Sequence, residues 1–210
     1  MFLAFEDEEE VKGETMTLGK LALLLLLSAL LGGCGTAAVL QKDSAGPGPD
    51  ESVIVIGVKP DAFRLHLREG TYASGGVTLD RVWGSAAING VARDGYLVAR
   101  AKAGQVLVVS DIYANYESGR GGSYGACAGN RALVFEVPKG QIAYVSDLEY
   151  EERDKKLWVR YVNRLAAAQE HVRVNYPRLT QEVQALKAQT LPVHTKCPGG
   201  GVIFIPIYVR

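Results

Sequence analysis

The chain has 210 residues, of which 48% are hydrophobic and 22% are charged, and its formal net charge is zero. This composition is typical of a globular protein with one domain or two small ones. A neutral chain gives no reason to expect binding to nucleic acid, so we predict no nucleic-acid partner. The 24 glycines and 10 tyrosines favour a loop-rich β protein.

The first apolar segment is LALLLLLSALL, residues 21–31, and it contains no charged residue. A helix of this length rises about 16 Å, whereas the hydrocarbon core of a bilayer is roughly 30 Å thick. The length instead fits the apolar core of a signal peptide, which runs for about 7–15 residues. A buried core helix is the alternative, but a leucine run has no amphipathic pattern with which to dock one face. We therefore predict a signal peptide over residues 16–33.

Residues 1–15 do not fit a signal peptide, because they carry six acidic residues and one lysine. Signal peptides begin with a positively charged region, and a chain starting at Met16 would have one through Lys20. We interpret residues 1–15 as a mis-annotated start, with translation beginning at Met16.

The end of the leucine run, Leu31-Gly32-Gly33-Cys34, resembles the lipobox of bacterial lipoproteins. The resemblance implies that a diacylglyceryl group is attached to the Cys34 thiol and that a signal peptidase cuts before this residue. It also implies acylation of the new amine, and two or more acyl chains anchor a protein stably where one does not. Because Gly35 is not aspartate, the resemblance favours the outer membrane, with the protein facing the periplasm.

Small residues, glycine and proline dominate the next segment, so residues 34–51 are predicted to be the lipid anchor and a flexible tether. With Cys34 assigned to lipid, Cys127 and Cys197 remain in an exported chain, and we expect them to form a disulfide. The loop of about 70 residues would contribute roughly 4 kcal/mol to stability in the chain-entropy model. A redox pair or a metal site is the alternative, but neither cysteine lies in a C-x-x-C and only His194 is near either one.

Short β-like runs make up most of residues 52–210. SVIVIGV (52–58) is continuously apolar, as in a strand buried on both faces. AFRLHLREG (62–70) alternates between apolar and polar residues. Further strands are predicted in 76–84, 86–112, 132–150, 157–162 and the carboxyl-terminal GVIFIPIYVR, with turn signals between them.

Helix is expected only over about residues 163–190. Asn163 can cap a helix over RLAAAQEHVRVN, which Pro177 ends. Thr180 can cap a second helix over QEVQALKAQ. The sequence thus predicts a mainly β fold: a small β-sandwich-like domain over residues 52–210 with one or two appended short helices.

One sequence pattern occurs twice within the β region. GQVLVVSDI (104–112) and GQIAYVSDL (140–148) share glycine, glutamine, valine, serine and aspartate in register. A duplicated unit and two independent strands ending at similar Ser-Asp turns are both compatible with this similarity.

Residues 133–179 resemble the uncharacterised exported DUF2846-like proteins, through Val137-Pro138-Lys139-Gly140, Tyr144-Val145-Ser146-Asp147-Leu148 and Tyr176-Pro177-Arg178-Leu179. This resemblance implies a fold more than an activity.

A search for catalytic chemistry finds no G-x-S-x-G, H-E-x-x-H or P-loop. The three histidines, His66, His171 and His194, have no partners at metal-ligand spacing, so we predict no metal site and no cofactor. Ser110-Asp111 and Ser146-Asp147 are interpreted as turns at strand ends. A catalytic triad assembled only by the fold would not show in the sequence.

The segment 113–130 is long and glycine-rich, and it carries tyrosine and arginine, which are enriched at contact hot spots. It is a candidate binding loop through Tyr113, Tyr116, Arg120 and Tyr124, although a surface loop pinned at Cys127 is an alternative.

The sequence therefore favours a non-catalytic lipoprotein of the bacterial cell envelope, with a binding or structural role and an envelope protein as a candidate partner. Its expected attachment is to the membrane, through lipid on Cys34. The alternative is an exported hydrolase with a site near 113–130, which a histidine hydrogen-bonded to serine or aspartate in a pocket would favour.

Overall fold

The structure is a computed structural model that describes residues 39–80, 86–114, 122–153, 156–197 and 208–209. The chain divides into two units, Met1–Gly35 and Thr36–Arg210. All described residues belong to the second unit, so the predicted leader and Cys34 lie outside them.

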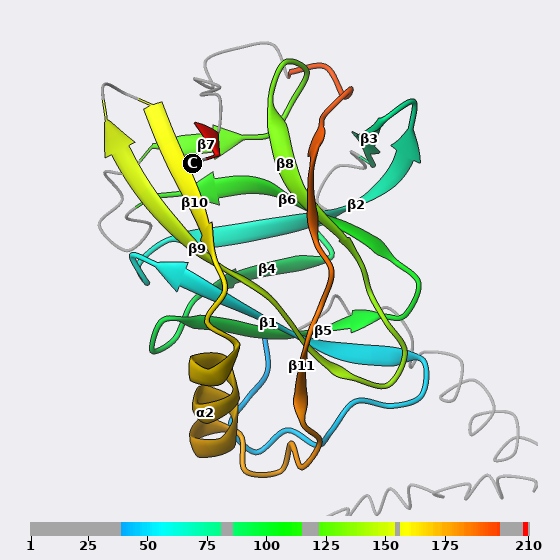
Figure 1. Ribbon diagram of the computed structural model, residues 1–210, viewed down its shortest axis with the longest axis vertical. Helices are drawn as coiled ribbons and strands as arrows, with labels where there is room; N and C mark the ends of the chain where they lie inside the picture. The colour runs from blue at the N-terminus through cyan, green and yellow to red at the C-terminus, as the bar shows by residue number, and fades with distance from the viewer. Residues whose placement is uncertain (1–38, 81–85, 115–121, 154–155, 198–207, 210) are drawn as a thin grey trace, which may run out of the picture. The chain divides into compact units, whose positions relative to one another are not determined.

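The second unit is mainly β, as the sequence predicts (Figure 1). Its described strands are β1 (Glu51–Lys59), β2 (Arg64–Ala73), β3 (Gly76–Leu79), β4 (Ile88–Val91), β5 (Tyr96–Lys102), β6 (Val106–Tyr113), β7 (Ser123–Gly125), β8 (Arg131–Glu136), β9 (Ile142–Arg153), β10 (Lys156–Val162), β11 (Val183–Ala185), β12 (Gln189–Pro192) and β13 (Tyr208–Val209). Helix α2 (Leu165–Asn175) follows β10.

The strands form two sheets, which we call the β9 sheet and the β6 sheet. The β9 sheet has the order β13-β10-β9-β1-β5, and β11 pairs with the first residues of β9 beside β10. The β6 sheet has the order β12-β8-β6-β2-β3, with β4 on β2 and β7 on β6. In the β9 sheet, β1 and β9 run parallel although most neighbouring strands in the structure are antiparallel.

The main core lies between the two sheets and takes alternate residues from each strand. Ile54 and Ile56 of β1 face this core, as do Leu65 and Leu67 of β2. The alternation predicted for residues 62–70 is therefore the one that the structure uses. Each sheet buries its other face as well, so β1 is apolar throughout because Val53 and Val55 pack on the opposite side.

Helix α2 covers part of the outer face of the β9 sheet (Figure 1). Ala168 and Val172 are its buried residues, and Tyr176 follows them in the same cluster. The N-cap position is Arg164, one residue after the predicted Asn163, and it has no side-chain capping bond. Asn163 Oδ1 instead accepts the backbone N–H of Leu165 at 3.1 Å from the position before the cap. The helix ends at Asn175, before Pro177.

The predicted second helix over residues 181–189 is wrong. Val183–Ala185 form β11, which runs parallel to Ile142–Tyr144 of β9, and residues 189–192 form β12. The sequence QEVQALKAQ favours helix locally, but β10 covers only the later part of β9 and leaves the edge at Ile142–Tyr144 for β11. Tertiary pairing overrides helix propensity here, because propensity amounts to only a few tenths of a kcal/mol per residue.

The predicted flexible tether over residues 34–51 is shortened by the structure. Val39 forms a β-bridge with Ala99, and the N–H of Leu40 donates to the carbonyl of Val98 at 2.8 Å. Leu40 is buried in the cluster beneath α2, and Arg100 binds the carbonyls of residues 45 and 46. The two apolar residues 39 and 40 pair with the edge of β5, so the chain from Val39 onward belongs to the domain.

Candidate functional site

An open cleft lies on the outer face of the β9 sheet, beside the N-terminal end of α2. Its volume is about 830 Å³. The described residues that line it come from β1, β9, β10 and the start of α2: Lys59, Pro60, Glu149, Tyr150, Glu151, Arg153, Trp158, Val159, Arg160 and Arg164. The floor of the cleft is therefore the half of the sheet that α2 does not cover.

Asp147 stands at the border between the covered half and the cleft. The pairing of β1 with β9 shifts between Val55/Tyr144 and Gly57/Asp147, so β9 has an extra residue there, a β-bulge. The bulge places the Asp147 carboxylate over Gly57, where a Cβ atom would lie 2.1 Å from Asp147 Oδ1. Only glycine at position 57 leaves room for this carboxylate, which belongs to a residue just 8% exposed.

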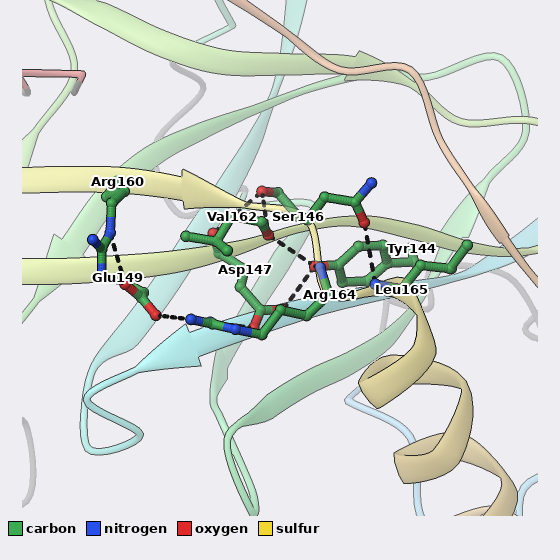
Figure 2. Close-up of polar contacts among 9 residues, drawn as sticks. Tyr144, Ser146, Asp147, Glu149, Arg160, Val162, Arg164 and Leu165 are labelled. Carbon is green, nitrogen blue, oxygen red and sulfur yellow. Dashed lines mark hydrogen bonds and ion pairs between the residues drawn. The ribbon is translucent and has the colours of Figure 1, made fainter.

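Three hydrogen bonds hold Asp147 and the chain that enters α2 (Figure 2). The Tyr144 hydroxyl donates to Asp147 Oδ1 at 2.8 Å, and Arg164 Nη1 donates to Asp147 Oδ2 at 2.9 Å. The backbone N–H of Arg164 in turn donates to the Tyr144 oxygen at 2.9 Å. Burial and, to a lesser degree, the bond to Asp147 raise the pKa of Tyr144, so the hydroxyl stays a donor at neutral pH.

Glu149 carries the network from Arg164 to Arg160 on the neighbouring strand (Figure 2). Arg160 Nε donates to Glu149 Oε2 at 2.9 Å, and Arg164 Nη2 donates to Oε1. These two guanidinium groups lower the pKa of the Glu149 carboxyl, with Arg160 as the larger cause. The Glu149 side chain is 13% exposed and that of Arg160 is 63% exposed, so the network runs from a buried end to an open one.

This arrangement is suited to binding. Four cationic and two acidic side chains line the described part of the cleft beside Trp158, and the carboxylates fix the arginine side chains before any ligand arrives. Preorganised guanidinium groups recognise carboxylate or phosphate oxygens with two parallel hydrogen bonds. None of the lining residues that the structure describes is a histidine, serine or cysteine.

The histidines do not form the pairs that would favour a hydrolase. The His66 ring packs against Tyr113 at a tilt, with ring centroids 4.8 Å apart, and interacts with Asn89. His171 Nδ1 lies 3.3 Å from Asn175 Nδ2, and His194 packs against Gly76. Within the described ranges, no histidine ring has a hydrogen bond to a serine or an aspartate.

The candidate binding loop separates into parts with different roles. Tyr113 is half-buried on β6 against His66, whereas Tyr124 on β7 is 3% exposed and belongs to the main core. Tyr124 is thus a core residue, because β7 pairs with β6 and turns this side chain inward. Tyr116 and Arg120 lie outside the described residues.

Cys127 and Cys197 form a disulfide, with Cα atoms 4.9 Å apart. The bond ties the turn after β7 to the segment after β12, and the N–H of Ala128 donates to the carbonyl of Thr195 beside it. The pairing agrees with the sequence analysis, and both cysteines lie in segments that follow strands of the β6 sheet and are not part of the lining of the cleft.

Sequence reasoning missed the residues of the cleft. The sequence predicts a turn at a strand end for Ser146-Asp147, but β9 continues to Arg153 and the Ser-Asp pair marks a bulge within it. The available signal was Gly57, because a glycine inside an apolar strand indicates a bulge or a close approach. Nothing in the sequence pattern pairs Glu149 with Arg160 and Arg164, since that contact depends on the register of β9 and β10.

Comparison of the chain with protein families, curated proteins and solved structures finds no match. The resemblances to bacterial lipoproteins and to the DUF2846-like proteins therefore stay predictions from the sequence. Among the described residues, no helix has the length and apolar character needed to cross a membrane. The same residues contain no cluster of three or more histidine, cysteine, aspartate or glutamate side chains that could hold a metal ion.

Proposed function

We propose that this chain is a lipoprotein of the bacterial cell envelope that binds a partner or ligand through the cleft on the β9 sheet and does not catalyse a reaction. The observation that carries the binding role is the open cleft, whose arginine side chains are held in place by Glu149 and Asp147. An acidic surface of an envelope protein is the kind of partner that fits it.

The packed segment from Val39 supports a role at the membrane surface. With lipid on Cys34, only residues 34–38 would separate the anchor from the domain. Five residues span at most about 17 Å when fully extended. The shortness of this link would then keep the domain close to the headgroups, and the outer membrane is the location that Gly35 favours.

The anchor is tested by the Cys34→Ala variant in cells given labelled palmitate. We expect the unaltered chain to take up the label and the variant to lose it and leave the membrane fraction. Cys127→Ser is the matched control, since it removes a cysteine and keeps Cys34. Equal labelling of Cys34→Ala and the unaltered chain would refute the anchor.

The cleft is tested by a photoreactive side chain at position 151, which lines it, and by the same group at position 182, an exposed residue outside it. In intact envelopes, we expect a crosslinked species from position 151 only. The double charge reversal Arg153→Glu and Arg160→Glu should abolish it in a folded protein. A crosslink that persists in this variant, or that forms equally from position 182, would contradict binding through the cleft.

A further inference from the structure

A second cavity, of about 340 Å³, lies on the other side of α2 and takes no part in the cleft. Its described lining consists of Lys42, Arg93, Asp94, His171, Asn175 and Tyr176. These residues come from three places: the amino-terminal segment, the turn between β4 and β5, and the last turns of α2. The fold brings two cationic side chains and a histidine together here.

His171 has an unmet hydrogen-bonding group. Its Nδ1 lies 3.3 Å from Asn175 Nδ2, which is a donor, so Nδ1 is the acceptor and the proton of the neutral ring is on Nε2. Nε2 is buried and has no hydrogen-bond partner. A buried donor without an acceptor is destabilising, and the His171 residue that carries it lines the cavity.

The charges around the cavity favour an anion. Lys42 makes one contact of 3.4 Å with Asn175 Oδ1, and Arg93 has no ion pair within the described part of the chain. Asp94 is the opposing carboxylate, so the fixed charges of the described lining sum to one positive charge before His171 is counted.

We propose that this cavity binds a phosphate group, held by Lys42 and Arg93 beside the ring of His171. The phosphate has two potential sources, a free anion and the headgroup of a membrane lipid. The headgroup source rests on the proposed anchor: Lys42 is eight residues after Cys34, which limits its distance from the lipid to about 28 Å. Binding of free phosphate does not depend on the anchor.

Phosphate binding should change the titration of His171 in a defined direction. Burial lowers the pKa of His171, Asp94 opposes this effect and Lys42 adds to it. Tyr96, whose ring centroid is 4.3 Å from that of His171, and Tyr176 complete its surroundings. A bound dianion favours the protonated ring, so the pKa of His171 should rise when the cavity is filled.

The test uses the full mature lipoprotein in a phosphate-free detergent, with isotope-labelled histidine observed by NMR. Inorganic phosphate is added at constant ionic strength. We expect a saturable shift of His171 alone, with His66 and His194 as internal references. The Lys42→Ala/Arg93→Ala variant should bind at least tenfold more weakly, and Lys187→Ala, an exposed lysine outside the cavity, should bind as the unaltered chain does.

Asp94→Asn separates anion binding from a structural effect, because it removes the opposing carboxylate and should tighten phosphate binding severalfold. Vesicles of phosphatidylcholine and vesicles containing phosphatidylglycerol then distinguish the sources. The bound signal in phosphatidylglycerol vesicles without free phosphate identifies the headgroup, and a bound signal with free phosphate alone identifies the anion. Absence of a saturable shift in both arms, or an equal response of the Lys42→Ala/Arg93→Ala variant, would overturn the proposal even if Cys34 carries lipid.

Discussion

The two similar segments 104–112 and 140–148 occupy equivalent positions in the two sheets. Each begins at a glycine with positive φ, Gly104 or Gly140, and continues as a strand buried on both faces, β6 or β9. Each has a β-bulge at its Ser-Asp pair, and each aspartate binds an arginine, Arg68 in the β6 sheet and Arg164 in the β9 sheet. The shared residues therefore produce the same local backbone twice.

The surroundings of the two aspartates differ. Asp111 lies opposite His66 on β2, and its side chain is 22% exposed. Asp147 lies opposite Gly57 on β1, and its side chain is 11% exposed. A bulge directs an aspartate out of the ladder in both sheets, but only the missing side chain at position 57 lets the carboxylate settle over the neighbouring strand.

Among the described residues, only the aspartate of the β9 sheet, Asp147, is connected to a wider network of hydrogen bonds. The position of Tyr144 in β9 corresponds to Val108 in β6, and that of Glu149 corresponds to Tyr113. The Asp147 site can thus bind the start of α2 and extend to Arg160, whereas the Asp111 site ends at Arg68 and Ser110. A local sequence pattern thus sets the bulge, while residues outside the pattern decide whether a site forms around it.

The strongest test of this difference is Gly57→Ala. The new Cβ would lie 2.1 Å from Asp147 Oδ1 and 3.1 Å from Asp147 Cα, so β1 and β9 must separate. Overpacking of this kind costs about 3 kcal/mol, and we expect that loss in the free energy of unfolding measured with urea. At the equivalent place in the β6 sheet, His66→Ala only removes a half-buried ring and should cost less than about 1.5 kcal/mol.

A second substitution identifies the carboxylate as the cause. In the Gly57→Ala background, Asp147→Ala removes the two closest atoms, and the combined loss should be smaller than the sum of the two single losses. Additive losses would mean that the glycine is needed for another reason.

The next effect in size is the loss of the arginine on each aspartate. Arg164→Ala leaves Asp147 and Glu149 without their shared donor and should lower the free energy of unfolding more than Arg68→Ala does. Arg68→Ala removes one bond to a more exposed carboxylate and should cost about 1 kcal/mol or less. Thermal and urea unfolding of both variants would check this order, and equal losses would break the comparison.

The elements that the sequence predicts are those set by a local pattern, and the elements it does not predict depend on residues outside the pattern. Strand β1, the alternation of β2 and helix α2 follow from local pattern, since the apolar period and the proline that follows the helix are contained in the segments themselves. The place of Leu40 beneath α2, the strand β11 and the Glu149 network depend on which strand lies beside which. Those pairings join residues far apart in the chain, and no local pattern contains them.

Tyr144→Phe tests the bond that joins the bulge to the helix. The hydroxyl donates to Asp147 and accepts the N–H of Arg164. Its removal therefore takes one hydrogen bond from the Asp147 carboxylate and one from the backbone N–H of Arg164. We expect a loss of about 1–1.5 kcal/mol in the free energy of unfolding. Tyr161→Phe is the matched control on the neighbouring strand, because burial alone raises the pKa of that hydroxyl and none of the described residues forms a hydrogen bond with it.

The smallest expected effect is the pH dependence that Glu149 confers. Arg160 and Arg164 lower the pKa of this carboxyl below its ordinary value near 4.5. A group whose pKa is lower in the folded state stabilises the protein above its unfolded pKa, and this contribution is lost as the pH falls through the folded value. Glu149→Gln should therefore be less stable than the unaltered chain at pH 7, by about 1 kcal/mol or less, and the difference should narrow as the pH falls below 4.5. Urea unfolding of both proteins across this range measures the difference directly. A stability difference that stays constant with pH would show that the charge of Glu149 does not stabilise the fold. The Asp147 site would then resemble the Asp111 site in depending on its aspartate and arginine alone.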